Sequence, residues 1–424
     1  MKIKTRKMDY DKVIRLPRPA AKRPKKPNIL FRTILNILSS GELKSCGFSY
    51  NENRMELAGR GPYLVLMNHS SFIDLKIATR ILYPKPTCIV CTSDGFVGKQ
   101  WLMRSIGCFP TQKFVSDLSL IGDMRYALKN GSNVLMYPEA SYSFDGTATP
   151  LPRKLGRVLK LLGVPVITII TKGAFLHDPL YNSLQLRKTK VTAEVTCLFT
   201  PEELESASAE QVQKALDDKF SFDNFRTQQA EGTVISAPFR ADGLNRILYK
   251  CAACGTEGMM EGRGTTLRCR SCGKVYELTP TGRLEAKNGN TEFSHIPDWY
   301  RWQRDEVRSD IENGDYCLDT DVSIGMMVDY KAIYMVGDGR LRHTADGFEL
   351  CGCDGRLRYT QSPVSSYSLY SDYYWYEIGD VICIGNRDCL YYCFPKCGGD
   401  VVAKTRLAAE EIYKIHMARR AAVK

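Results

Sequence analysis

A histidine and an aspartate stand five residues apart in the segment Asn-His-Ser-Ser-Phe-Ile-Asp, residues 68–74. Neutral imidazole is the best side-chain base near pH 7, so His69 could remove the proton from an attacking hydroxyl group. A carboxylate on the other ring nitrogen, here Asp74, would fix the tautomer and stabilise the imidazolium that forms. On a regular helix the two side chains would point about 140° apart. They can meet if His69 lies in a turn and Asp74 in the first turn of a helix behind it.

The flanking sequence predicts the strand, turn and helix that this geometry needs. Residues 63–67 form an apolar run that is typical of a buried strand. Residues 71–83 have a helical pattern, with Ser70 or Ser71 as a candidate N-cap. The alternative is a histidine at a strand end with an unrelated aspartate at a helix start, and these seven residues alone favour neither interpretation.

The same alternation of apolar runs and helical patterns extends over residues 28–235. It predicts an α/β domain in which helices cover a sheet. The expected strands are 63–67, 87–91, 133–137 and 164–171, and the expected helices are 71–83, 116–130, 153–162 and 201–220.

Three further blocks follow the first in order. They are Gly-Cys-Phe-Pro-Thr-Gln-Lys at 107–113, Tyr-Pro-Glu-Ala-Ser-Tyr-Ser at 137–143 and Gly-Val-Pro-Val-Ile-Thr at 163–168. Together, the four blocks resemble the motifs of the glycerol-3-phosphate and lysophosphatidate acyltransferase family, and the resemblance covers about residues 30–225. It implies a mixed central sheet flanked by helices. It also implies transfer of a fatty acyl group from acyl-CoA or acyl-carrier-protein to the hydroxyl of lysophosphatidate (1-acyl-sn-glycerol 3-phosphate) in phospholipid biosynthesis.

The resemblance also implies roles for individual residues. His69 is the expected catalytic base and Asp74 the residue that orients it. Lys113 would hold the acceptor's phosphate as a point charge, where the family more often has arginine. The expected substrate-binding residues are Asn68, Lys113, Glu139 and Ser141, with Glu139 beside the acceptor and Ser141 offering a hydroxyl.

Three positions depart from the family pattern. Ala140 and Tyr142 stand where the third block usually has glycine and arginine, and Thr168 stands where the fourth block ends in proline. The family's arginine contacts phosphate, so Tyr142 leaves open a different lysolipid or alcohol acceptor. An alternative of another class is a non-catalytic binding platform.

Two Cys-x2-Cys-Gly pairs, separated by 14 residues, lie within residues 247–279. This spacing predicts a zinc ribbon with a closed, structural four-thiolate site. The expected ligands are Cys251, Cys254, Cys269 and Cys272; iron, or no metal, is the alternative. The ribbon could bind a partner, but a stabilised spacer is favoured. Cys389, Cys393 and Cys397 lack a regularly spaced fourth ligand, so we expect them in a core.

Residues 295–424 have short alternating runs, turn signals and a helical pattern at 401–419. They predict a small β-rich domain closed by a C-terminal helix. The outline resembles pleckstrin-homology-like domains in architecture only.

The N-terminus is strongly basic. Residues 1–27 hold 11 Lys or Arg and two acids, which gives +9 of the net charge of +12. We expect a disordered tail that, with the apolar helix starting at residue 28, contacts an anionic membrane surface in preference to nucleic acid. A solvated arm and a helix packed on its own domain are the alternatives.

No apolar run is long enough to span a bilayer, and the start does not resemble a secretory signal peptide. Of the sixteen cysteines, those outside the four-cysteine array are most simply reduced, buried small hydrophobes. We therefore expect a cytoplasmic protein, peripherally associated with the inner face of the membrane. Its partners would be an acyl thioester donor, a lysophospholipid acceptor and, as one donor form, an acyl carrier protein.

Overall fold

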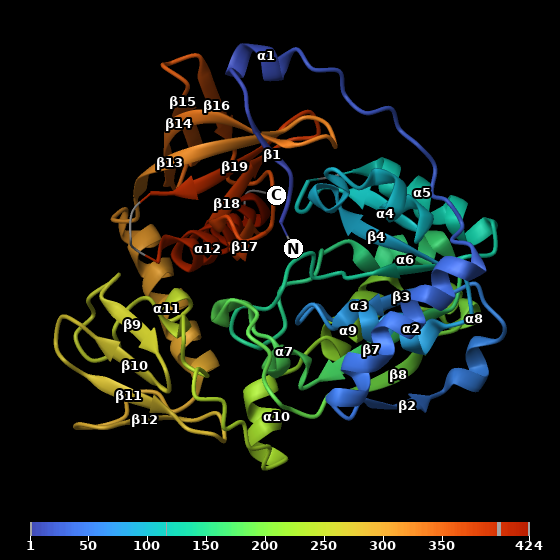
Figure 1. Ribbon diagram of the computed structural model, residues 1–424, viewed down its shortest axis with the longest axis horizontal. Coiled ribbons are helices and arrows are strands. Elements are labelled where there is room, and N and C mark those ends of the chain that lie inside the picture. The colour runs from blue at the N-terminus through green and yellow to red at the C-terminus, as the bar shows by residue number, and fades with distance from the viewer. Residues whose placement is uncertain (1, 116, 397–399, 423–424) are drawn as a thin grey trace.

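The computed structural model describes residues 2–115, 117–396 and 400–422, which pack into one body of three parts (Figure 1). A single hydrophobic core contains side chains from all three parts, for example Phe175, Leu267 and Leu341. Cys389 and Cys393 are buried as expected, whereas Cys397 lies outside the described residues.

The N-terminal domain, residues 29–230, is built on a seven-stranded sheet with the order β2–β8–β7–β3–β6–β4–β5. β7 and β8 run antiparallel and the other neighbours are parallel, so the sheet is mixed, as the resemblance implied. The strands are β2 (Ser49–Asn53), β3 (Leu64–Met67), β4 (Thr87–Thr92), β5 (Cys108–Thr111), β6 (Asn133–Met136), β7 (Val166–Lys172) and β8 (Thr192–Phe199).

Helices cover both faces of this sheet, because successive side chains of a strand point to opposite sides. Val65 and Met67 of β3 belong to one core, and Leu64 and Leu66 to the other. The first core is covered by α2 (Ile29–Ser45), α3 (Asp74–Leu82) and α4 (Gln100–Ser105). The second is covered by α5 (Leu118–Lys129), α6 (Leu155–Leu162), α8 (Pro201–Ser206) and α9 (Ala209–Lys219). The short helices α7 (Ala174–His177) and α10 (Asn224–Ala230) face the cysteine module described next.

The four predicted strands and the first three predicted helices are confirmed with small shifts of their ends. The predicted helix 201–220 is wrong as a single element. It divides into α8 and α9 because Ser208 begins a new helix, accepting a hydrogen bond from Gln211 N–H in a capping box. The expected serine N-cap of the helix after β3 is also wrong: Ile73 holds that position, and the backbone N–H groups of Ser70 and Ser71 bind Asp74 instead.

The cysteine module, residues 251–286, is a four-stranded antiparallel sheet with the order β12–β11–β10–β9. Its strands are β9 (Met260–Arg263), β10 (Thr266–Cys269), β11 (Val275–Leu278) and β12 (Leu284–Ala286). The ring of Tyr276 packs edge-on against Trp299, 4.9 Å between centroids. The indole of Trp299 donates to the carbonyl of Lys250, which ties the module to the next part of the chain.

The C-terminal domain, residues 296–422, contains most of an eight-stranded sheet, whose strands in this domain follow one long helix in the chain and precede another. The main path is β16–β15–β14–β13–β19–β18–β17, and β1 (Thr5–Lys7) adds to β14. The elements are α11 (Ile296–Asn313), β13 (Leu318–Met327), β14 (Ile333–Thr344), β15 (Gly347–Gly352), β16 (Leu357–Gln361), β17 (Tyr370–Trp375), β18 (Gly379–Gly385), β19 (Leu390–Pro395) and α12 (Val401–Ala422). The expected β-rich region with a closing helix is therefore present.

The expectation of a disordered tail at residues 1–27 is wrong. β1 pairs in parallel with β14, and α1 (Tyr10–Ile14) buries Val13 in the shared core. The chain then crosses to the N-terminal domain, where Arg23 pairs with Asp123 at 3.0 Å (Figure 1). A composition rich in lysine and arginine predicts solvation of side chains, but it does not reveal that a sheet edge in a distant domain can accept the backbone. Within the ranges described, no helix has the length and hydropathy needed to cross a bilayer.

Candidate active site

His69 and Asp74 meet in the way that the strand–turn–helix pattern predicts. His69 lies two residues beyond the end of β3, and Asp74 is the first residue of α3. His69 Nδ1 lies 3.1 Å from Asp74 Oδ2. The same carboxylate oxygen accepts hydrogen bonds from the backbone N–H groups of Ser70, at 2.7 Å, and Ser71, at 3.0 Å. The turn therefore wraps around the carboxylate of Asp74, and this carboxylate holds the imidazole of His69 through Nδ1.

Burial governs the protonation of the pair. It lowers the pKa of His69 well below 6.5, and the charge of Lys113 lowers it further. Burial also raises the pKa of Asp74, to about 7, against the backbone hydrogen bonds from Ser71 and Ser70 that lower it. A neutral imidazole that donates from Nδ1 to this carboxylate has Nε2 available to take a proton, which is the state that a general base requires.

Two tyrosine rings enclose the imidazole. The ring of Tyr137 stacks on His69 with centroids 4.1 Å apart, and that of Tyr142 stacks on it at 4.0 Å. Tyr142 also stacks on Phe72, whose side chain is exposed. The histidine side chain retains 16% exposure. The rings fix the plane of the imidazole and leave an edge of it accessible.

Glu139 lies behind the histidine and is fully buried. Its Oε2 accepts from the backbone N–H of His69 at 2.8 Å, and its Oε1 accepts from the N–H and hydroxyl of Thr149. Burial raises the pKa of Glu139, to about 7, and these hydrogen bonds act in the opposite direction. In this arrangement Glu139 holds the main chain at His69, and the expected contact of Glu139 with the acceptor stays a prediction.

Asn68 and Ser141 also act on the backbone around the base. The side chain of Asn68 accepts from the N–H and hydroxyl of Thr171 and so joins the ends of β3 and β7. The hydroxyl of Ser141 donates to the carbonyl of Tyr142 at 3.3 Å. Both side chains are buried, and their expected substrate contacts stay predictions.

Lys113 lies at the mouth of this site. Its Nζ lies 5.8 Å from the ring centroid of Tyr142 and 4.2 Å from that of Tyr370 in the C-terminal domain. The second block therefore places a cation next to the aromatic stack, and the expected contact of Lys113 with the acceptor's phosphate stays a prediction.

Comparison with known proteins agrees with this geometry. Residues 49–172, which contain all four blocks, match the model of the protein family described as Acyltransferase. This stretch is therefore an acyltransferase-like region within the N-terminal domain. No curated protein matches the chain. Among solved structures, the 1-acyl-sn-glycerophosphate (LPA) acyltransferase PlsC from Thermotoga maritima is similar at 16% identity, with a TM-score of 0.35, over 45% of this chain and 76% of that one. From here on, the N-terminal domain is called the acyltransferase domain.

The four cysteines of the module converge as their spacing predicts. The sulfur atoms of Cys251 and Cys272 are 3.8 Å apart, as are those of Cys254 and Cys269, and all four lie within 4.8 Å of one another. A tetrahedral zinc ion with Zn–S bonds of about 2.3 Å places its sulfurs about 3.8 Å apart. The four thiols can therefore hold such an ion.

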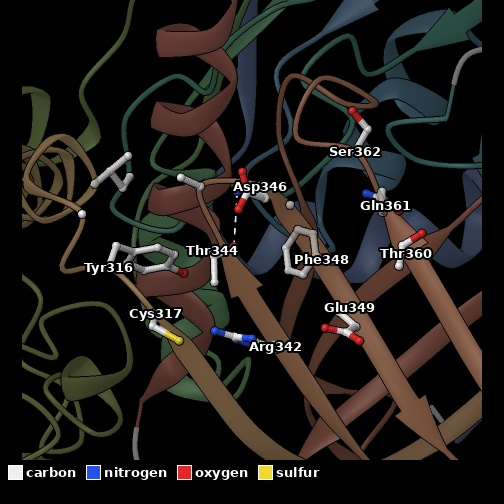
Figure 2. Close-up of a pocket in the computed structure, with 14 residues that line it drawn as sticks. Tyr316, Cys317, Arg342, Thr344, Asp346, Phe348, Glu349, Thr360, Gln361 and Ser362 are labelled. Carbon is white, nitrogen blue, oxygen red and sulfur yellow. Dashed lines mark hydrogen bonds between the residues drawn. The ribbon is translucent and has the colours of Figure 1, made fainter.

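A separate concave surface of about 640 Å³ lies in the C-terminal domain, where the hairpin of β14 and β15 meets the end of α11 (Figure 2). Arg342 and Glu349 are cross-strand neighbours on its floor, and Asp346 lies in the hairpin turn. It shares no residue with the aromatic stack around His69, so it is not part of the transfer site.

A second cavity, of about 660 Å³, separates the acyltransferase domain from α11 and α12 and reaches Thr149, the residue that holds Glu139. Its basic and acidic side chains are equal in number: Arg301, Arg304, Arg308, Arg406 and Lys414 against Asp145, Asp217, Asp305, Glu410 and Glu411. It therefore lies beside the active site without offering net positive charge.

Sequence reasoning missed the aromatic and C-terminal members of the site. Tyr142 was visible as a departure from the family's third block, although its stacking on His69 was not. Tyr370 and the nearby Asp372 lie some 260 residues after Lys113 in the chain, and nothing in the local sequence marks them.

Proposed function

We propose that this acyltransferase moves a fatty acyl group from an acyl-CoA or acyl-carrier-protein thioester to the hydroxyl of a lysolipid, with lysophosphatidate as the lead acceptor in phospholipid synthesis. The observation that carries the proposal is the contact of His69 Nδ1 with Asp74 Oδ2 at 3.1 Å. It supports a neutral base of fixed tautomer, which an ester-forming transfer needs and which simple lipid binding does not.

The proposed reaction needs no enzyme nucleophile, because a thioester is already activated. The acceptor hydroxyl attacks the thioester carbonyl while Nε2 of His69 takes its proton. Asp74 stabilises the imidazolium. The tetrahedral intermediate then releases the thiolate, which takes the proton back, so that an ester and a free thiol are formed. Glu139 keeps the base in place through the backbone N–H of His69.

The choice of a phosphate-bearing acceptor is supported by Lys113, whose ammonium lies beside the stack on His69. A second candidate, acylation of a different lysolipid or alcohol, is supported by Tyr142. This ring packs against the imidazole at the position where the family has a phosphate-binding arginine. The two candidates share the acyl transfer and differ in the acceptor.

We also propose that the enzyme works at a membrane surface on the cytoplasmic side. Helices α2 and α4 both carry exposed apolar side chains, and the ring of Phe31 on α2 contacts that of Trp101 on α4, with centroids 5.9 Å apart; this set of side chains is called the apolar patch. The patch consists of Ile29, Leu30, Ile34, Ile37, Leu38, Trp101 and Leu102. The exposed residues Lys22, Lys25 and Lys26 precede it in the chain. An apolar face beside basic side chains is the pattern of an interfacial helix on anionic lipid.

The membrane proposal is tested by point substitutions, because a deletion of the N-terminus would also remove β1 and Val13 from the fold. Ile37→Glu with Leu38→Glu should reduce sedimentation with anionic vesicles at least about tenfold. Leu161→Glu, on α6 at the opposite face of the sheet, is the matched control and should bind normally. Equal vesicle binding by all three proteins would rule the patch out.

We propose that the four cysteines hold a structural zinc ion. The C-terminal domain, whose sequence outline resembles pleckstrin-homology-like domains in architecture only, is a candidate binding module whose ligand is open. A non-catalytic platform is the competing function for the whole chain.

The deciding experiment is mass spectrometry of lipids after the purified protein is incubated with acyl-CoA or acyl-carrier-protein and a mixture of lysolipid acceptors. We expect a diacyl product, lost by about 10²- to 10⁴-fold in His69→Ala. If no acceptor is acylated, or if His69→Ala retains full activity, the proposed transfer is wrong.

A further inference from the structure

The C-terminal domain reaches into the mouth of the transfer site through strand β17. The hydroxyl of Tyr370 donates to Asp94, a fully buried residue of the 3-10 turn Ser93–Phe96 that follows β4. The indole of Trp375 in turn donates to the hydroxyl of Tyr370 at 2.9 Å. These bonds fix the position of β17 on the acyltransferase domain.

Lys113 is held between the two domains. Its ammonium lies 4.2 Å above the ring of Tyr370 and 5.8 Å from that of Tyr142, which is itself stacked on His69. A cation in this position is attracted by the aromatic ring stacked on His69 and by the ring of Tyr370 on β17. The C-terminal domain is therefore placed to change what Lys113 can bind.

Asp372 supplies a carboxylate on that face. Tyr370 and Asp372 lie two residues apart in a regular stretch of the β17–β18 ladder, so their side chains share one side of the sheet. Asp372 is 8% exposed, and its Oδ1 accepts from the backbone N–H of Tyr373 at 3.2 Å. Burial raises the pKa of Asp372, to about 7, and the charge of Lys113 is the largest effect that lowers it. The ammonium of Lys113 lies over the ring of Tyr370, and the carboxylate of Asp372 is on the same side of β17, so the two charges are neighbours across the domain boundary.

We propose that Asp372 is a specificity-determining residue that competes with the acceptor's head group for Lys113. Resting on the proposed function, it weakens the hold of Lys113 on a phosphate monoester, so that lysophosphatidate is used less efficiently than it would be without this carboxylate, and acceptors whose head group has no net negative charge gain in relative rate. A phosphate monoester carries roughly −1.5 to −2 charges at pH 7, so it would have to approach a cation that already has an anionic neighbour. An uncharged or zwitterionic head group meets no such repulsion.

The experiment compares two acceptors with the same acyl chain and glycerol unit, lysophosphatidate and monoacylglycerol, in the full-length protein. Asp372→Asn removes the charge and keeps the shape. We expect the ratio of kcat/KM for lysophosphatidate to that for monoacylglycerol to rise about tenfold, through a lower KM for lysophosphatidate. Asp346→Asn removes an exposed acid from the β14–β15 turn and should leave the ratio unchanged (Figure 2).

Lys113→Met provides a second arm, which tests whether the effect of Asp372 passes through this lysine. It should lower the same ratio, and in that background Asp372→Asn should change the ratio less than about twofold, because the two effects pass through one interaction. A ratio that does not change in Asp372→Asn, or equal losses on both acceptors, would overturn the proposal. Failure of the wild type to acylate any acceptor would instead overturn the proposed function itself.

Discussion

The phenol ring of Tyr142 stacks on the imidazole of His69, with centroids 4.0 Å apart and an angle of 30° between the ring planes. Tyr142 belongs to the third block, and His69 to the first. The tyrosine that stands in place of the family's arginine thus also packs against His69. Where the family has a cation, this chain has a rigid ring that packs against the imidazole of His69.

Removal of this ring should reduce turnover. Aromatic pairs contribute about 0.5–1.5 kcal/mol beyond the area they bury, so we expect Tyr142→Ala to lower kcat by about 3- to 10-fold as the imidazole gains freedom. Tyr142→Phe keeps the stack and should retain kcat within about twofold. Steady-state kinetics on one acceptor would check both variants, and an equal loss in the two would assign the effect to the hydroxyl.

The pH profile should respond to Lys113. The base acts only when unprotonated, so kcat/KM falls as the pH drops through the pKa of the His69–Asp74 pair. Burial and the charge of Lys113 both lower the pKa of His69. Removal of the cation in Lys113→Met favours protonation of the pair, whichever member takes the proton, and should move the acid limb to higher pH.

This shift is measured as kcat/KM from pH 4.5 to 8 with monoacylglycerol, an acceptor that has no phosphate for Lys113 to bind. Lys154→Met, which removes a lysine from the start of α6, is the control. An acid limb that stays in place, or that moves to lower pH, would contradict the assignment.

Local patterns predicted the parts of the structure in which neighbours in sequence are neighbours in space. The β3–turn–α3 segment is an example, because Asp74 reaches His69 through a loop of only four intervening residues. The tyrosine at 142 could be seen but not placed, since its contact depends on the register of β3 beside β6. Ala140 adopts φ of 56°, a left-handed conformation for which the family's glycine is better suited.

The long-range parts could not be predicted in this way. The pairing of β1 with β14 joins residues that are more than 300 positions apart, and its edge strand has no local signature. The same holds for Tyr370 and Lys113, which meet only because β17 docks on the turn at Asp94. Composition and periodicity describe which faces are apolar, and they do not describe which domain will cover them.

Arg406 of α12 should stabilise the catalytic loop. It is 4% exposed, donates to the carbonyl of Tyr142 at 3.3 Å, lies 4.3 Å above the ring of Phe144 and pairs with the buried Glu410. Breaking a buried ion pair by removing one partner costs about 3–5 kcal/mol. Because Glu410 also pairs with Arg304 at 2.7 Å, we expect Arg406→Met to cost about 2–3 kcal/mol in urea unfolding.

The double variant Arg406→Met with Glu410→Gln is the matched comparison. It removes the carboxylate that Arg406 leaves behind, although it also leaves Arg304 with fewer partners. We expect its stability to lie within about 1 kcal/mol of the single variant, which indicates coupling between the two residues. Strictly additive losses would show that Arg406 acts through Tyr142 and Phe144 alone.

The four-cysteine module should lose stability when metal is removed. A closed four-thiolate site contributes directly to folding, and Cys251 and Cys269 belong to the same core as Trp299 and the C-terminal domain. We expect about one zinc ion per chain by elemental analysis, and a fall in Tm of at least about 5 °C in Cys269→Ser or after chelation. Cys317→Ser, an exposed cysteine outside the module, should retain both metal and Tm. Because the four cysteines and the His69–Asp74 pair belong to different sheets, the turnover of the molecules that remain folded should not change. A metal-free protein with an unaltered Tm would contradict the structural role of the site.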